Sequence, residues 1–324
     1  MYYTVPYKTK QFFFVLIKLS LVVGAFYFIY KKLIHNDTLS FSDFTAFSSQ
    51  NGVFSIKNVF FLLILSFFNW FFEILKWKNL VSPVKAINFK NAIAQSLGSL
   101  TASLITPNRI GEYGAKAMYY TSKLRKRILV VNLISNLIQM SVTVILGSIG
   151  FYIYVITYKP DLHYYELVKY SVILLIVLFL LGLVITKSKF TFKGFSLKNI
   201  KHFLAAYPKR KLILGFLFSG IRYVIFSFQF YILLLIFHVN LGYLEDMVII
   251  TSMYLIASVI PSIFIFDVIV KGGIAVYLFS LVGVNELIIL SVITLMWLLN
   301  FVVPSLFGSY YVLKFKLPEN KDYI

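Results

Sequence analysis

Six long runs of predominantly apolar residues limit what this chain can fold into more than any other feature of its sequence. The runs cover residues 12–30, 59–76, 128–157, 167–186, 211–238 and 286–313. A helix needs about 20 apolar residues to cross the roughly 30 Å of hydrocarbon in a bilayer. Only 13% of the 324 residues are charged, whereas soluble proteins average about 25%. We therefore predict an all-α polytopic membrane protein with six full transmembrane helices.

Two further apolar segments are interrupted before they can cross. One lies in residues 91–120 and is broken by Pro107, and the other lies in residues 247–283 and is broken by Pro261. Proline lacks the backbone N–H and clashes with the preceding turn, so it ends or kinks a helix. A more polar stretch with glycine follows each break. We interpret both segments as broken-helix hairpins that enter the membrane and return to the same side.

The distribution of Lys and Arg sets the orientation of these segments. The chain carries 31 Lys and Arg against 12 Asp and Glu, a net charge of +19. The basic residues concentrate near both termini and in the connections 76–90, 116–127 and 187–211, whereas 158–166 and 239–246 are neutral or acidic. Cytoplasmic loops collect Lys and Arg, so both termini are expected in the cytoplasm. This explanation of the charge needs no nucleic-acid partner.

The order of segments repeats in the two halves of the chain. Residues 1–157 and residues 158–324 each read as a span, a connection, a second span, a broken segment and a third span. Three full crossings in the first half insert the second half upside down. Inverted repeats of this kind are typical of transporters, in which broken helices at matching positions mark the substrate site. We therefore predict two inverted repeats with these boundaries.

The first broken segment contains "TPNRIGEYG", residues 106–114, which combines helix breakers with charge. Non-helical backbone is tolerated at membrane depth only where it is buried in protein or lines a wet cavity. We expect Pro107, Gly111 and Gly114 to shape a tight turn, with Pro261 as the matching hinge in the second half. Arg109 and the N-terminus of the returning half-helix would bind a phosphate. The alternative is an ordinary cytoplasmic loop with a surface ion pair.

Acidic and basic residues recur at helical spacing in both broken segments. Glu112 and Lys116 are four residues apart, as are Asp267 and Lys271, so one helical turn brings each pair onto one face. Arg222, about a third of the way into a span, requires an acidic partner or a phosphate. The predicted substrate-binding residues are Arg109, Glu112, Lys116, Arg222, Asp267 and Lys271.

Two other polar groups lie within predicted spans. Glu73 shares a helical face with Asn69 and Lys76, although it lies close to a cytoplasmic helix end and could snorkel there. A stripe of polar residues on span 128–157 is typical of hydrogen bonding between helices. The stripe consists of Asn132, Asn136 and Gln139.

Metal and thiol chemistry find no support in the sequence. There is no cysteine, and the four histidines show no metal-ligand spacing. Enzymes that act on lipid-linked substrates commonly hold Mg²⁺ with carboxylate clusters. The adjacent acids Glu245 and Asp246 lie in a short outer connection, where a solvated cap is the simpler interpretation. We therefore predict no metal and no cofactor.

The segment "SLITPNRIGEYGAKAMYY" resembles the Pro-x-Arg-x-Gly-Glu signature of the lysylphosphatidylglycerol synthase transmembrane (flippase-like) family. The matching positions are Pro107, Arg109, Gly111 and Glu112. The resemblance spans roughly residues 10–315 and indicates a stand-alone member without the synthase domain. In the second half, "IPSIFIFDVIVKGGIAVYLF" keeps a proline and a lysine, but a glycine, residue 272, stands where the family has a glutamate.

The resemblance implies a multi-pass protein of a bacterial plasma membrane that moves lipids or lipid-linked sugars between leaflets. Our leading hypothesis is a lipid translocase, not an enzyme, whose partner is a membrane lipid or a polyprenyl-phosphate-linked substrate. The headgroup would pass through a polar cavity between the two hairpins. The alternatives are an integral-membrane enzyme acting on lipid-linked substrates and a non-catalytic scaffold for a lipid-modifying enzyme. The sequence leaves homo-oligomerisation open.

Overall fold

The computed structural model describes most of the chain. The described residues are 16–20, 22–24, 27, 30–31, 40–104, 106, 110–160, 191–192, 195–259 and 266–318, with backbone alone for 191–192, 195–199, 259 and 266–271. Helices dominate these residues, as predicted, and the described strands are two short ones. The predicted span 167–186 and about half of the predicted span 12–30 lie outside them.

Four predicted spans are confirmed as helices long and apolar enough to cross a membrane. They are α3 (Ile56–Val81), α6 (Ser122–Tyr158), α9 (Lys209–Ile236) and the continuous helical segment Glu286–Lys314. The last comprises α12 (Glu286–Trp297), the π-helical turn η2 (Leu298–Val302) and α13 (Val303–Lys314). Each contains nearly all of a predicted span and extends it by a few residues. The part of the chain that the structure describes therefore belongs to a multi-pass helical bundle.

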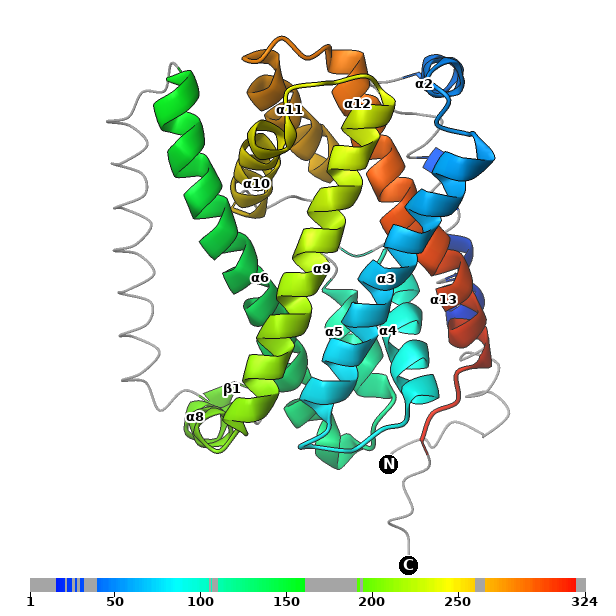
Figure 1. The fold of residues 1–324 in the computed structure, drawn as a ribbon. Helices are drawn as coiled ribbons and strands as arrows, with labels where there is room; N and C mark the ends of the chain where they lie inside the picture. The colour runs from blue at the N-terminus through cyan, green and yellow to red at the C-terminus, as the bar shows by residue number, and fades with distance from the viewer. Residues whose placement is uncertain are drawn as a thin grey trace, which may run out of the picture.

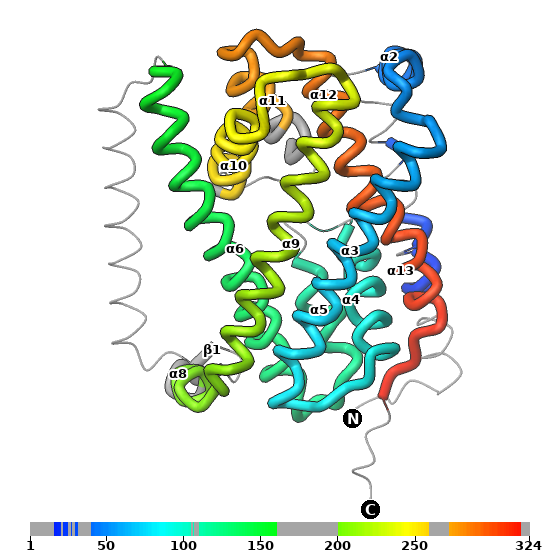
Figure 2. Tube along the Cα trace, in the orientation of Figure 1, coloured from blue at the N-terminus to red at the C-terminus, as the bar shows by residue number. Residues whose placement is uncertain are grey.

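Each predicted broken segment forms two shorter helices. The first corresponds to α4 (Phe89–Ser103) and α5 (Gly111–Met118), and the second to α10 (Tyr243–Val259) and α11 (Phe266–Ser280). Helices α4 and α10 begin a few residues before the predicted segments. The two members of each pair contact each other. In Figures 1 and 2, α4 and α5 lie in the lower half of the molecule, whereas α10 and α11 lie in its upper half.

The connections between the long helices contain smaller elements. Helix α2 (Phe41–Gln50) precedes α3, and Ser40 caps its N-terminus by accepting a hydrogen bond from the backbone N–H of Asp43. A hairpin of β1 (Thr191–Phe192) and β2 (Phe195–Ser196) leads into α8 (Leu197–Ala205). Figure 1 shows α2 at the upper end of the bundle and α8 at the lower end.

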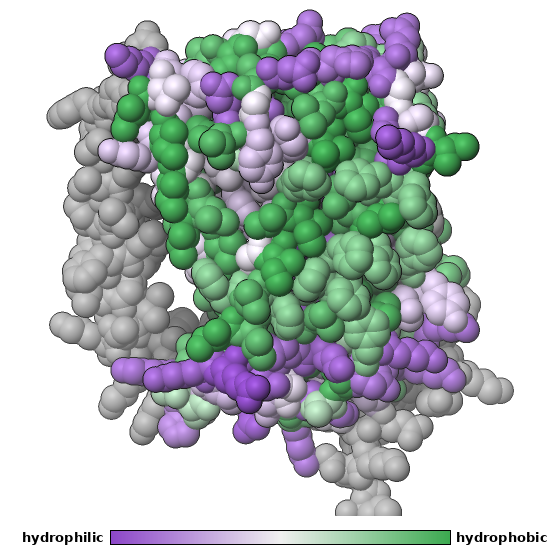
Figure 3. Space-filling model, viewed as in Figure 1, coloured by the Kyte–Doolittle hydropathy of each residue, from purple (hydrophilic) through white to green (hydrophobic). Residues whose placement is uncertain are grey.

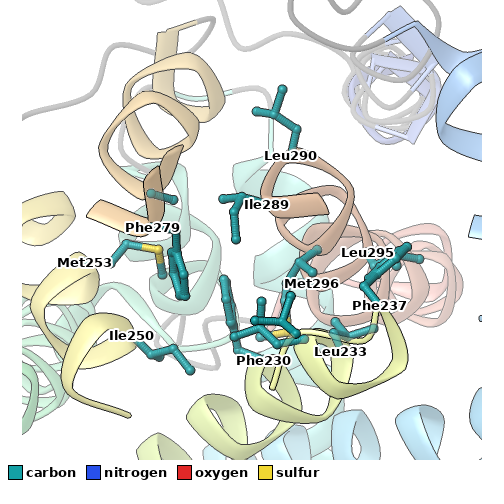
Figure 4. Close-up of a cluster of buried hydrophobic side chains, with 14 of the residues drawn as sticks. Phe230, Leu233, Phe237, Ile250, Met253, Phe279, Ile289, Leu290, Leu295 and Met296 are labelled. Carbon is teal, nitrogen blue, oxygen red and sulfur yellow. The ribbon is translucent and has the colours of Figure 1, made fainter. Parts of the chain in front are cut away.

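The largest apolar cluster lies between α9, α10, α11 and α12. Figure 4 shows Phe230 and Phe279 facing each other among aliphatic side chains from these helices, and their rings stack with centroids 6.0 Å apart. A second cluster lies around Trp77 and Tyr120, between α3, α5 and α6. The charged residues described below lie beside this second cluster.

The surface is divided into bands that fit a membrane protein. Figure 3 shows a broad apolar band around the middle of the visible face, with hydrophilic residues gathered at its upper and lower ends. Large apolar side chains of the long helices are exposed, including Phe67 at 64% and Ile213 at 68%. Such exposure is expected where the surrounding medium is lipid, because burial among lipid tails replaces burial in a protein core.

Candidate functional site

One face of α3 carries the polar residues around which the site is built. Asn69, Glu73 and Lys76 are spaced i, i+4 and i+7, which places them on the same side of a helix. All three are buried, with 2%, 7% and 1% of their surfaces exposed. The prediction that they share a face is confirmed. Snorkelling, the alternative for Glu73, does not fit this burial, because a snorkelling side chain keeps its charged head in water.

Glu73 lies between two cations. Its Oε2 accepts a hydrogen bond from Nη1 of Arg222 at 2.6 Å and lies 2.7 Å from Nζ of Lys76. Arg222 comes from α9, and its Nε donates to Oδ1 of Asn69 at 2.9 Å. The arginine therefore has the acidic partner that its position inside a span requires, and that partner lies on a helix distant in the sequence.

A second ion pair lies on α5. Nζ of Lys116 donates to Oε1 of Glu112 at 2.7 Å, so the contact predicted from their spacing is present. The same ammonium lies 4.2 Å from the centroid of the Trp77 ring, which gives it a cation–π contact. Lys116 is 1% exposed and Glu112 is 8% exposed. An ion pair this deeply buried differs from the surface pair that was the alternative interpretation.

The polar stripe of α6 makes hydrogen bonds to neighbouring helices, as predicted. Oδ1 of Asn132 accepts a hydrogen bond from Nζ of Lys116 on α5 at 2.9 Å. Nδ2 of Asn136 donates to the hydroxyl of Tyr113 at 2.9 Å. Oε1 of Gln139 accepts hydrogen bonds from Nζ of Lys76 at 3.5 Å and from Nη1 of Arg222 on α9 at 3.3 Å. Helix α6 thus connects the ion pair of α5 to the ion pairs of α3.

These ion pairs form one group, which we call the charged cluster. It consists of Glu73, Lys76, Glu112, Lys116 and Arg222. The charge of Lys116 acts on Glu73 as well as on its own partner. Three cations face two carboxylates, so the cluster has a surplus of positive charge. Within the described ranges, no group of three His, Cys, Asp or Glu is placed to hold a metal ion.

A chain of amide side chains extends from the charged cluster to the last long helix. Nδ2 of Asn69 donates to Oδ1 of Asn300 at 2.7 Å, and Nδ2 of Asn300 donates to Oε1 of Gln229 at 2.8 Å. Gln229 in turn donates to the hydroxyl of Ser66 at 2.8 Å. Hydrogen bonds between buried amides fix the relative rotation of α3, α9 and the π-helical turn.

Asn300 owes its position to an irregularity of the backbone. Pro304 has no N–H, so it cannot donate to the carbonyl four residues earlier, which is that of Asn300. The indole Nε1 of Trp70 donates to this carbonyl instead, at 2.9 Å. π-Helical turns occur frequently at functional sites, and this one places an amide next to the charged cluster. Pro304, which lies inside the apolar run 286–313, was the sequence signal that could have revealed this irregular turn.

The remaining predicted site residues are only partly described. Pro107, Arg109 and Pro261 lie outside the described residues. Asp267 and Lys271 lie on α11, which is described there by its backbone alone. Their predicted contacts therefore stay predictions.

The two glycines at the start of α5 have different surroundings. A β-carbon on Gly111 would lie 2.8 Å from Cγ2 and 2.9 Å from Oγ1 of Thr106. The backbone N–H of Gly111 donates to this Oγ1 at 2.9 Å. A β-carbon on Gly114 would meet no atom within 4 Å. Close packing at the break therefore requires a glycine at position 111 and does not require one at position 114.

A known family matches nearly the whole chain. The family described as "Lysylphosphatidylglycerol synthase TM region" matches residues 15–308. This range includes the whole charged cluster, the amide chain and both broken segments. A search of curated proteins found no match.

Proposed function

The chain belongs to the lysylphosphatidylglycerol synthase TM region family, and we propose that it is a lipid translocase that moves an anionic headgroup between leaflets. The observation that carries this proposal is the charged cluster. Ionisable side chains inside a membrane are costly, and where they occur they mark pathways for ions or substrates. The family's link to lipid processing makes a lipid headgroup the substrate class that fits.

The composition of the charged cluster favours a phosphate group. Arg222 can bind two oxygens through its planar guanidinium, and Lys76 and Lys116 add point charges. In the structure the carboxylate of Glu73 accepts from the guanidinium. A phosphate would compete with this carboxylate for the same donors. Binding would thereby break the ion pair, and departure of the lipid would restore it.

The short helix pairs supply the proposed path for the headgroup. Helix α4 has 15 residues and α5 has 8, so at 1.5 Å per residue they are about 22 Å and 12 Å long. Both are shorter than the roughly 30 Å of hydrocarbon. We place α4–α5 and α10–α11 as re-entrant hairpins of an inverted repeat, with Arg109 and Lys271 as additional phosphate contacts. Their location in opposite halves of the bundle supports this arrangement (Figure 1).

The exposed basic residues support a cytoplasmic location for the end of the bundle that carries α8. Lys123 and Lys126 at the start of α6, Lys201 of α8, and Lys209 and Arg210 at the start of α9 are exposed. Positive side chains at helix ends on one side are typical of the cytoplasmic face. The proposed orientation, with both termini in the cytoplasm of a bacterial cell, follows from this asymmetry.

Reconstitution tests the proposal directly. Purified protein in liposomes that contain fluorescent phosphatidylglycerol should expose inner-leaflet label to an external quencher. Arg222→Gln should slow this transfer by about tenfold or more, since a hydrogen bond to a charged group contributes about 1.5–3 kcal/mol and each 1.4 kcal/mol is about tenfold. Arg210→Gln is the matched control, because it removes an exposed arginine from the same helix.

The possible outcomes distinguish a specific role of the charged cluster from a general effect of surface charge. Wild-type transfer rates in both Arg222→Gln and Glu112→Gln would contradict the placement of the headgroup at the charged cluster. Equal losses in Arg222→Gln and Arg210→Gln would show that general surface charge, and not the half-buried guanidinium of Arg222, controls transfer. Size-exclusion profiles and helical circular dichroism matching wild type are required of each variant.

A further inference from the structure

A buried carboxyl group lies outside the charged cluster, in the first turns of α10. Asp246 is 0% exposed. Neither of its carboxyl oxygens has a hydrogen-bond partner in the described parts of the chain. An ionised carboxylate without a partner is very costly to bury, and such groups take up a proton instead. The neighbouring acid, Glu245, is exposed, so burial is specific to one of the two adjacent acids.

The packing around this carboxyl group is tight. Helix α10 crosses α6 at two glycines, Gly147 and Gly150. A β-carbon on Gly147 would lie 2.7 Å from Cβ of Leu255, and one on Gly150 would overlap Oγ1 of Thr251. The two backbones therefore approach each other closely, about one and a half to two and a half turns from the acid. We call this contact between α6 and α10 the glycine contact.

Among the described residues, the groups that interact electrostatically with Asp246 provide no counter-ion. They are Tyr158, near the end of α6, and Glu245 on its own helix. In the described parts of α9 and α11, no side chain donates a hydrogen bond to it. Burial and the nearby acidic charge together raise the pKa of the Asp246 carboxyl to about 6. Both effects act in the same direction, toward a neutral carboxylic acid.

Helix α10 also contacts α9, the helix that carries Arg222 of the charged cluster. The ring of Tyr254 packs against Tyr223 and Phe226 of α9, with centroids 5.9 Å and 5.4 Å apart. Tyr223 directly follows Arg222 in the chain. A displacement of α10 would therefore act on the segment of α9 that positions the guanidinium.

We propose that Asp246 is a proton-binding site that couples headgroup transfer to a proton gradient. With the proton bound, the carboxyl is neutral and the glycine contact is closed, as in the structure. When the O–H bond breaks, the proton passes to water and the remaining carboxylate must be hydrated, which separates α10 from α6. The proton site rests on the contacts of Asp246 alone, whereas its coupling to transfer rests on the proposed function.

The first experiment needs no transport. Infrared difference spectra of the full-length protein, recorded between about pH 4 and pH 8, report the carbonyl stretch of protonated carboxyl groups. A band should disappear as the pH rises through about 6. It should be missing in Asp246→Asn and retained in Glu245→Gln. A band that persists in Asp246→Asn, or titration of Asp246 near pH 4 as in an exposed acid, would overturn the proton site.

The second experiment tests the coupling. Proteoliposomes containing fluorescent phosphatidylglycerol are given an imposed pH gradient or none. The gradient should accelerate transfer in the wild-type protein and in Glu245→Gln, and should leave Asp246→Asn unchanged. Equal acceleration of Asp246→Asn and wild type would refute the coupling while leaving the translocase intact. Absence of transfer under every condition would refute the proposed function and the coupling together, and the infrared titration would still decide the proton site.

Discussion

Replacing Glu73 with glutamine should cause one of the larger losses of stability available in this chain. The substitution keeps the shape of the side chain and removes the charge that faces Lys76 and Arg222 at 2.7 and 2.6 Å. Removing one partner of a buried ion pair costs about 3–5 kcal/mol. The amide oxygen of glutamine can still accept one hydrogen bond, which contributes about 1 kcal/mol. The expected decrease in the free energy of unfolding is therefore about 2–4 kcal/mol.

Denaturant unfolding in detergent micelles measures this decrease. Trp70 and Trp77 lie beside the charged cluster, so their fluorescence reports its disruption. Glu286→Gln is the control, because this glutamate is exposed in the first turn of α12 and contributes at most about 1 kcal/mol there. Adding Lys76→Met to Glu73→Gln should restore part of the loss, since neighbours in one ion-pair network couple by about 0.5–3 kcal/mol.

A small effect would refute the reasoning. If Glu73→Gln unfolds within about 0.5 kcal/mol of the wild type, as a surface substitution does, the carboxylate is not the buried counter-ion that the distances indicate. Strict additivity of Glu73→Gln and Lys76→Met would lead to the same conclusion, because it would mean that the two side chains do not interact.

Further predictions concern packing and pH. Gly308→Ala should lower the free energy of unfolding by about 1–3 kcal/mol, because a β-carbon there would overlap the carbonyl oxygen of Leu97 and the hydroxyl of Thr101. Gly220→Ala meets no atom within 4 Å and should stabilise α9 by up to about 1 kcal/mol. Because burial raises the pKa of Asp246 from 3.8 to about 6, its contribution to stability is complete below about pH 4 and is lost as the pH rises through 6. The loss is about 3 kcal/mol by pH 8, measured as the pH dependence of unfolding that Asp246→Asn removes.

Apolar run length was sufficient to locate the four long helices that the structure describes. The run 59–76 became α3, Ile56–Val81, and the run 211–238 became α9, Lys209–Ile236. Length and hydropathy decide such segments because only a continuous helix satisfies the backbone inside a bilayer. The ends shifted by a few residues, since capping and polar residues in the terminal turns extend a helix beyond its apolar part.

Local spacing also predicted part of the site. The pair Glu112–Lys116 follows from the geometry of one helical turn, and Arg222 was recognisable as a charge inside a span that needs a partner. The identity of that partner was not recognisable, because spacing along α3 does not tell which helix packs against it. Asn300 was missed for a related reason: its amide reaches Asn69 only through the packing of a helix that lies 231 residues away in the chain.

The π-helical turn Leu298–Val302 determines which surface α13 presents to its neighbour. An α-helix rotates by about 100° per residue, so one extra residue in a turn offsets everything after it by about that angle. With this offset, the carbonyl of Ser305 accepts a hydrogen bond from Thr101 of α4 at 2.9 Å. Leu306 and Phe307 then point outward, 46% and 65% exposed. Without the extra residue, the small side chains of α13 would turn away from α4 and bulky ones would collide with it.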